Sequence, residues 1–256
     1  MRVNNHSALL LNAVSKNYGQ VKALKTVNIN IEKAEFVALL GQNGAGKTTL
    51  FQLLTGLFNS DEGEIRVCGN DIQRKPIPAL SSIGVVFQQA TLDLDLTVHG
   101  NLKFHCLLHG LSRKEAESRI DDELQRFGLE EIKNKAVRSL SGGNRRKVEL
   151  IRALLHRPKV LLMDEATVGL DPESRHSLVE HVRSLCRERN MAVLWSTHIV
   201  EEVQSADRVI VLHKGQVLAE STPTQLVEES SNPAFSLAEA FLQLIGTNKN
   251  TGVVYE

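Results

Sequence analysis

The chain has 256 residues, of which 42% are hydrophobic and 23% charged, and these proportions are ordinary for a globular protein with a substantial core. Lysine and arginine together number 30, as do aspartate and glutamate, so the formal net charge is zero. This balance does not favour a nucleic-acid partner, because proteins that bind nucleic acid usually present a strongly basic surface.

The sequence contains no segment of its own that would enter a membrane. No apolar run approaches the roughly 18 residues that a spanning helix needs. The first residues, MRVNNHSALLLNAV, lack the charged start, long apolar middle and cleavage site of a secretory signal. The cysteines Cys68, Cys106 and Cys186 are scattered without a CxxC pair, which indicates reduced thiols in the cytoplasm. A function at a membrane would therefore require docking onto another chain.

In the first 90 residues, short apolar runs alternate with polar breaks, which is typical of strands. Strands are predicted at 9–14, 27–31, 36–40, 65–68 and 83–87. The first two suit a small antiparallel β-layer. The run at 36–40, FVALL, leads directly into glycine-rich sequence, and a helix is predicted at 48–57.

From about residue 89 to 158 the sequence becomes helical in character. In 112–127 (SRKEAESRIDDELQRF) apolar residues recur at three- to five-residue steps, which predicts an amphipathic helix. Ser112 followed by Glu115 forms a capping-box pattern at its start. We interpret 89–158 as a helical subdomain inserted into an α/β core.

After residue 158 the chain alternates again between predicted strands and predicted helices. Strands are predicted at 160–163, 192–196 and 209–212, and helices at 174–189, 200–205 and 237–245, followed by a frayed tail, GTNKNTGVVYE. Alternating strands and helices predict an α/β fold, with a mostly parallel core sheet and helices on both faces.

Residues 41–48, GQNGAGKT, fit the phosphate-loop pattern G-x-x-x-x-G-K-[ST]. A predicted strand precedes the motif and a predicted helix follows it, which argues against an incidental glycine-rich turn. Backbone N–H groups in such a loop face phosphate oxygens, Lys47 reaches the β- and γ-phosphates, and the Thr48 hydroxyl binds Mg²⁺. The predicted nucleotide-binding residues here are Gly41, Gln42, Asn43, Gly44, Ala45, Gly46, Lys47, Thr48 and Thr49.

A second motif is acidic and ends a predicted buried strand: VLLMDE at 160–165. Ligands of open α/β sheets bind at the carboxyl ends of strands. Asp164 is therefore expected to hold Mg²⁺ and Glu165 to act as the base that activates water. Taken alone, two acidic residues could equally be a solvated turn; the phosphate loop makes the catalytic interpretation the better one.

The motif LSGGN at 140–144, about twenty residues before the acidic strand, resembles the signature of ABC ATPases, which usually reads LSGGQ. Asn144 departs from that pattern but keeps an amide. Ser141 and the N–H groups of Gly142 and Gly143 at a helix start form a suitable anion site. The basic run that follows, 145–147, is interpreted as a solvated helix face.

Further positions match the pattern of this family in order and spacing, over roughly residues 8–228. By resemblance, Tyr18 stacks on adenine and Gln88 contacts Mg²⁺ and the attacking water. Asp171, in GLDP, belongs to the loop that crosses to a partner subunit, and His198, in WSTH, contacts the γ-phosphate. Ala166 replaces the usual proline after the catalytic glutamate, which puts the hydrolysis rate in more doubt than ATP binding.

The resemblance implies a P-loop NTPase of ABC type, with an ATPase domain at 1–230 and a short C-terminal helix and tail at 231–256. It implies a homodimer or pseudo-dimer that binds two ATP molecules with Mg²⁺, on the cytoplasmic face of the inner (plasma) membrane, and powers a separate permease. The segment VVFQQATLDLDLTVHGNLKFH, at 85–105, resembles subunits paired with ABC-2 type export permeases, which favours export.

Two other classes of function were weighed. A soluble ABC ATPase acting on DNA or ribosomes would be expected to carry coiled-coil insertions or two cassettes, and neither is present. A module that uses ATP only to dimerise would fit the departures Asn144 and Ala166, but Lys47, Glu165 and His198 argue for hydrolysis.

Three histidines, His99, His105 and His109, lie close together, with Cys106 among them. His105 and His109 would share a helix face, a spacing that can hold zinc or copper. No further ligand pair is evident from the sequence, and Phe104, Leu107 and Leu108 resemble a packing face. We therefore interpret these histidines as ordinary helix residues.

Overall fold

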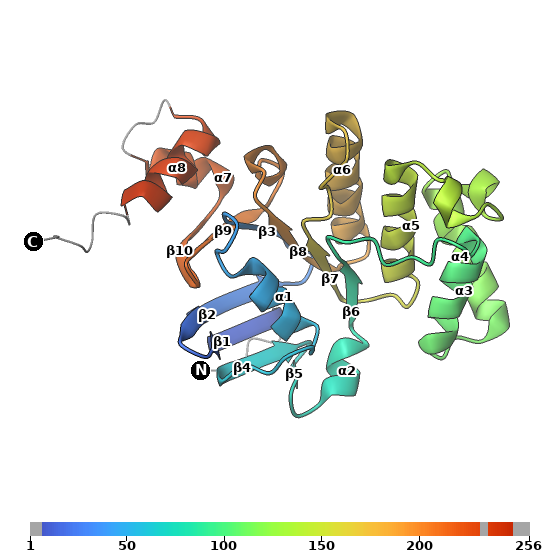
Figure 1. The fold of residues 1–256 in the computed structure, drawn as a ribbon, viewed down its shortest axis with the longest axis horizontal. Coiled ribbons are helices and arrows are strands. Elements are labelled where there is room, and N and C mark those ends of the chain that lie inside the picture. Colours follow the sequence, from blue (N-terminus) through green and yellow to red (C-terminus); the bar gives the residue numbers. More distant parts are fainter. Residues whose placement is uncertain (1–6, 231–234, 248–256) are drawn as a thin grey trace, which may run out of the picture.

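The computed structural model describes residues 7–230 and 235–247, which form two sheets flanked by helices (Figure 1). The N-terminal segment 1–6 and most of the predicted frayed tail, 248–256, lie outside the described residues. Within the described ranges, no helix combines the length and the apolar character that crossing a membrane requires.

The smaller sheet is antiparallel, in the order β2-β1-β4-β5. Its strands are β1 (Ser7–Tyr18), β2 (Val21–Glu32), β4 (Glu62–Val67) and β5 (Asn70–Asp71). The expected antiparallel layer is confirmed. β1 and β2 are each 12 residues long, well beyond the apolar runs that predicted them, because their pairing continues through β-bulges into polar sequence.

The larger sheet has the order β10-β9-β3-β8-β7-β6. Its strands are β3 (Phe36–Leu40), β6 (Ile83–Val86), β7 (Val160–Asp164), β8 (Ala192–Thr197), β9 (Arg208–His213) and β10 (Gln216–Ser221). All neighbours pair in parallel except β9 and β10, which form an antiparallel hairpin. β10 was not predicted, because this edge strand is only half-buried and has no continuous apolar run.

The helices are α1 (Lys47–Leu54), α2 (Pro76–Leu80), α3 (Val98–Leu108), α4 (Arg113–Arg126), α5 (Gly142–Leu154), α6 (Pro172–Glu188), α7 (Pro223–Glu228) and α8 (Leu237–Thr247). Short 3₁₀ turns occur at η1 (Glu130–Ile132), η2 (Val137–Ser139) and η3 (Val200–Val203). The helix predicted at 200–205 is thus a single 3₁₀ turn. Helices α3, α4 and α5 lie together at one end of the molecule, and α7 and α8 at the other (Figure 1).

Continuous apolar strands place the core on both faces of the larger sheet. Along β3, Phe36, Ala38 and Leu40 belong to the cluster that includes α5 and α6, whereas Val37 and Leu39 belong to the cluster between this sheet, α1 and the smaller sheet. Successive side chains of a strand point to opposite faces, so a fully apolar strand is buried from both sides. This burial holds the strand ends, where the polar motifs lie, in fixed positions.

The helical segment departs from expectation in two respects. Ser112 caps α4 by accepting a hydrogen bond from the N–H of Glu115 (3.2 Å), but the Glu115 side chain binds Arg119 rather than completing a capping box. On α3, the interpretation of Phe104, Leu107 and Leu108 as a packing face is wrong: all three are exposed, by 61%, 47% and 68%. The buried side is formed by other residues, including Leu102 and Cys106.

Candidate active site

The phosphate-loop sequence connects β3 to α1, as its motif predicts. At two positions the backbone requires glycine. A Cβ at Gly41 would lie 2.6 Å from the carbonyl oxygen of Leu212, and Gly46 has φ +110° with the carbonyl oxygen of Ala23 2.8 Å from where a Cβ would be. The loop can therefore curl tightly before the helix begins at Lys47.

A turn between β9 and β10 holds the phosphate loop from behind. The N–H of Gly215 donates to the carbonyl oxygen of Ala45 (2.8 Å), and the N–H of Lys25 donates to the carbonyl oxygen of Gly215 (2.8 Å). The motif alone does not indicate these contacts, because they come from strands that were recognised only as apolar runs, or not at all. They fix the loop relative to both sheets.

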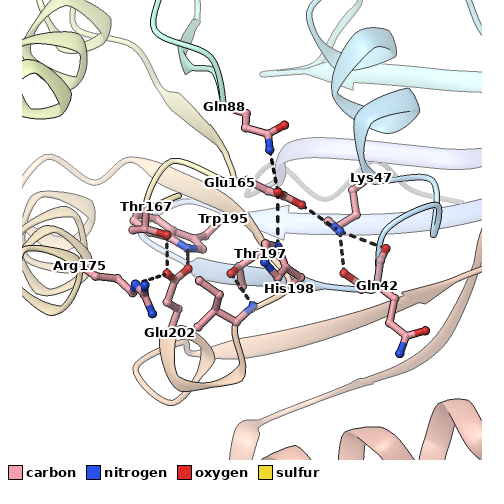
Figure 2. Close-up of polar contacts among 12 residues, drawn as sticks. Gln42, Lys47, Gln88, Glu165, Thr167, Arg175, Trp195, Thr197, His198 and Glu202 are labelled. Carbon is pink, nitrogen blue, oxygen red and sulfur yellow. Dashed lines mark hydrogen bonds and ion pairs between the residues drawn. The ribbon is translucent and has the colours of Figure 1, made fainter. Parts of the chain in front are cut away.

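The carboxylate of Glu165 lies where three predicted catalytic side chains converge (Figure 2). Its Oε1 is 3.1 Å from Lys47 Nζ, and its Oε2 is 3.2 Å from Gln88 Nε2, which donates to it, and 3.4 Å from His198 Nδ1. Lys47 also donates to the carbonyl oxygens of Gly41 (2.6 Å) and Gln42 (3.2 Å). The carboxylate is 11% exposed, so these interactions are only partly screened by solvent.

The backbone at Glu165 is held in an unusual conformation. Its φ is +45°, in the left-handed region that costs a residue with a side chain about 1–3 kcal/mol. The N–H of Glu165 donates to the carbonyl oxygen of Ser196 (3.0 Å), and Ala166 is fully buried in the core. Packing thus constrains the turn at which proline is the more usual residue.

The phosphate loop lines a pocket of about 660 Å³. Predicted residues in its wall are Asn43, Gly44, Gly46, Lys47, Thr48, Thr49, Gln88 and Glu165. Lys22, Lys25 and Lys214 also line it and were missed, because no motif surrounds them. Their side chains give the pocket a basic character that suits a polyphosphate.

Tyr18 is not among the residues that line this pocket. It ends β1, is 41% exposed, and donates its hydroxyl hydrogen bond to Gln52 Oε1 (3.2 Å). Its ring lies edge-on to Phe58, with 6.1 Å between the centroids. Its strand partner Val21 does line the pocket, so the tyrosine lies just beyond the pocket edge, and stacking on adenine stays a prediction.

The donor set for Mg²⁺ can be tested against the structure. Thr48 and Gln88 line the same pocket, and Asp164 ends β7 directly before Glu165. Asp164 is 8% exposed, and this burial raises the pKa of its carboxyl group. A divalent cation would favour the ionised form of such a carboxylate, and hydroxyl, amide and carboxylate oxygens are the ligands that Mg²⁺ prefers. The residues present therefore fit this ion.

The LSGGN segment forms a second, separate hollow of about 390 Å³. Ser141 caps α5 by accepting from the N–H of Asn144 (3.3 Å), so the helix begins directly at the two glycines. Asp171, which caps α6 by accepting from the N–H of Ser174 (2.9 Å), lies in the wall of the same hollow. Among the residues that the structure describes, none lines both this hollow and the phosphate-loop pocket.

Comparison with known proteins agrees with this geometry: the ABC transporter family profile matches residues 24–168. The chain belongs to the ABC transporter family. It is 40% identical over 210 residues to the ABC transporter ATP-binding protein NatA of Bacillus subtilis (strain 168), covering 81% of this chain and 85% of NatA. It is 37% identical over 222 residues to Nod factor export ATP-binding protein I of Paraburkholderia xenovorans (strain LB400), covering 86% of this chain and 73% of that protein.

A solved structure extends the comparison to the reaction. The dimeric, post-hydrolysis state of the ATP-binding cassette MJ0796, bound to ADP and Pi, superposes with a TM-score of 0.75 at 29% identity, covering 84% of this chain and 98% of that one. The fold is that of an ABC-type P-loop NTPase, and this ABC subunit binds and hydrolyses ATP.

One buried residue near the site was misread from the sequence. Arg146, interpreted as part of a solvated basic face, is 7% exposed. Its guanidinium donates to the carbonyl oxygens of Phe87 (2.6 Å) and Gln88 (2.9 Å) and pairs with Glu149 (2.7 Å), which also accepts from the N–H of Thr91 (2.7 Å). The signature helix α5 is thereby bonded to the segment that carries Gln88.

A second missed residue is Glu202, which lies in η3 and is 4% exposed. Its carboxylate accepts from Trp195 Nε1 (2.9 Å) and from the Thr167 hydroxyl, and lies 3.6 Å from Arg175 (Figure 2). Thr167 follows Glu165 by two residues. Glu202 therefore ties the turn at Glu165 to the end of β8, next to His198.

The Glu202→Leu substitution is expected to lower the free energy of unfolding by about 1–3 kcal/mol, because it leaves the buried Trp195 N–H and Thr167 hydroxyl without an acceptor. Urea unfolding followed by fluorescence measures this directly, since Trp195 is the single tryptophan of the chain. The exposed neighbour Glu201→Leu is the matched control. Equal unfolding midpoints for the two variants would contradict the supporting role of Glu202.

Proposed function

We propose that two copies of this ABC subunit close head to tail around two ATP molecules and thereby drive export through a separate membrane permease. The observation that carries the proposal is the separation of two half-sites within one chain. The phosphate-loop pocket and the LSGGN hollow have no lining residue in common within the described ranges. In a head-to-tail pair, one chain's hollow can cover the nucleotide in the other's pocket, and rotational symmetry then makes two equal sites.

The motif side chains around the pocket have distinct roles in this arrangement. Lys47 neutralises the β- and γ-phosphates; a phosphate oxygen can replace Glu165 as its partner, which releases that carboxylate to take a proton from the attacking water. His198 and Gln88, both within 3.4 Å of the carboxylate, orient it and the water. Thr48, Gln88 and Asp164 would hold Mg²⁺, which supplies charge neutralisation at the phosphates.

The signature segment supplies the opposite wall. Gly142 and Gly143 present backbone N–H groups at the start of α5, where the helix dipole favours an anion, and Ser141 lies beside them. Asp171 lines the same hollow, so in the closed dimer it would face the partner subunit. ATP then acts as an adhesive: its binding stabilises the closed dimer, and hydrolysis removes that stabilisation.

The surface that would meet the permease is the segment from β6 to the end of α3. Large apolar side chains are exposed along it, namely Phe87, Leu94, Leu96, Phe104, Leu107 and Leu108. Clustered exposed apolar residues mark interaction sites. Gln88 lies in the same segment, so docking there can be coupled to the catalytic carboxylate. Export, rather than import, is supported by the likeness to the Nod factor export protein, and placement on the cytoplasmic face follows from docking.

The head-to-tail arrangement is tested by mixing two inactive variants. Lys47→Ala removes the phosphate contact, and Gly142→Asp puts a carboxylate opposite the phosphates. Gly142 has helical φ and nothing within 4 Å of an added Cβ, so the aspartate fits without strain. Each variant alone is expected to lose hydrolysis. An equimolar mixture should recover about a quarter of wild-type phosphate release, because half the dimers are mixed and each has one complete site.

Two controls make the result decisive. Gly142→Ala, which adds bulk without charge, should keep substantial activity. Thermal unfolding of the Gly142→Asp variant should match the wild-type protein, since an acidic residue in the first turn suits the helix dipole. If the mixture stays inactive while both variants are folded, the composite site is refuted. If Gly142→Asp alone hydrolyses ATP at the wild-type rate, the signature segment has no part in catalysis.

A further inference from the structure

Three histidines from separate parts of the chain meet beside helix α3. His105 lies in α3, His109 ends that helix, and His156 follows α5. One ring nitrogen from each lies within 4.8 Å of the corresponding nitrogens of the other two. The sequence could not show this, because His156 is 47 positions or more away and belongs to no motif.

The rings are packed against one another rather than dispersed in solvent. His109 and His156 stack with 4.0 Å between their centroids, and His105 lies 4.5 Å from His109 and 5.7 Å from His156. His105 and His156 are half-buried, whereas His109 is exposed. The cluster is therefore open to solvent on one side and closed on the other.

Within the described part of the chain, two buried ring nitrogens of this cluster have no hydrogen-bond partner: His105 Nε2 and His156 Nδ1. Buried polar atoms are normally bonded, so each such atom calls for an explanation. The other nitrogen of His156 lies 2.8 Å from the carbonyl oxygen of Ile83. A carbonyl can only accept, so this nitrogen carries the proton and His156 Nδ1 keeps a free lone pair.

The surroundings keep the rings in the form that binds metals. Burial lowers the pKa of His105 to about 3 and that of His156 to about 4, so both are neutral near pH 7. The nearby cations already have partners: Arg119 binds Glu115 and the carbonyl oxygen of Leu155, and Arg152 binds the carbonyl oxygen of Thr91.

We propose that His105, His109 and His156 form a binding site for a divalent transition metal of the zinc class, independent of the nucleotide site. Three neutral imidazoles with one open coordination position are a known ligand set for zinc, and imidazole also suits copper and nickel. The hydrogen bond from His156 to Ile83 is the kind of outer contact that orients a metal-bound histidine.

The geometry requires a small adjustment. Zinc–nitrogen bonds of about 2.0–2.1 Å place tetrahedral ligand atoms roughly 3.4 Å apart. Binding therefore requires the ring of His109, which is exposed at the end of α3 and stacks on His156, to turn toward the two half-buried histidines. His99 and Cys106 are not members of the site: His99 binds Glu117 at 2.8 Å, and Cys106 is buried in the hydrophobic core.

Occupancy would add a bond between α3 and the segment after α5, which lie side by side. The metal would tie the end of α3 to His156, two residues after α5, which is itself hydrogen-bonded to the start of β6 at Ile83. Helix α3 also carries the exposed Phe104, Leu107 and Leu108. A bound metal would therefore fix the orientation of this apolar face relative to the core sheet.

The test uses the full chain without a histidine tag, treated with chelator and held in saturating Mg²⁺ and ADP so that the nucleotide site is occupied. Zn²⁺ is titrated calorimetrically, and Co²⁺ is added as an absorption probe for tetrahedral coordination. His109→Gln is compared with His99→Gln, the same substitution on the same helix. Because His109 is exposed, its replacement leaves the core intact, and a thermal unfolding curve without metal verifies the fold.

We expect one Zn²⁺ per chain, tetrahedral Co²⁺ bands, and a metal-dependent rise in unfolding temperature, all retained in His99→Gln. His109→Gln should weaken Zn²⁺ binding by more than about tenfold and abolish the bands. Absence of saturable binding to the wild-type chain overturns the proposal. Equal affinities of the two variants overturn it as well, because the metal would then be bound elsewhere.

Discussion

Replacing Glu165 with glutamine is expected to reduce ATP turnover by roughly 10²–10⁴ while leaving ATP binding intact. The amide keeps an oxygen for the hydrogen bond from Gln88 (3.2 Å) but can no longer take a proton from water. It also ends the ion pair with Lys47 (3.1 Å), which leaves the lysine fully available to phosphate. The variant should therefore accumulate as an ATP-bound dimer.

Phosphate release and light scattering after size exclusion, both with and without ATP, measure the two effects together. Glu201→Gln, an exposed carboxylate three positions after His198, is the matched control and should behave as wild type. A Glu165→Gln protein that hydrolyses ATP within a few-fold of wild type would exclude this residue as the base. A variant that stops hydrolysis but stays monomeric with ATP would support the catalytic role of Glu165. It would refute the proposal that bound ATP stabilises the dimer.

Replacing Arg146 with methionine is expected to lower the free energy of unfolding by about 3–5 kcal/mol. The substitution leaves Glu149, which is 1% exposed, as a buried charge without its counter-ion. It also removes the donors to the carbonyl oxygens of Phe87 and Gln88. Urea unfolding followed by Trp195 fluorescence measures the loss, and phosphate release should fall with it because Gln88 is no longer held.

Two further variants test whether the loss of stability comes from the unpaired charge of Glu149. Arg145→Met changes the preceding residue of the same helix, for which the described part of the chain shows no ion pair, and should cost much less. Arg146→Met/Glu149→Leu removes the stranded charge and should regain part of the stability, as apolar replacement of a buried pair often does. If Arg146→Met is as stable as Arg145→Met, the buried pair of Arg146 and Glu149 contributes little to stability.

Much of the site could be predicted from local sequence, because its pieces are short and continuous. A phosphate loop is a strand, a glycine-rich turn and a helix in immediate succession, and β3, Gly41–Lys47 and α1 appear where the pattern places them. Glu165 and His198 could be assigned to the same edge of the sheet because both follow buried parallel strands, β7 and β8, whose carboxyl ends coincide.

What the sequence by itself determined is thus the fold class, most strands of the core sheet and the motif side chains at their ends. The tertiary structure alone decided the long-range partners. From the sequence Arg146 is predicted to be a surface charge, whereas in the fold it donates to a carbonyl oxygen 59 positions away. His105 lies beside His156 only because α3 packs against α5. Polar side chains carry no periodic signal for such partners, because the packing of apolar faces brings them together.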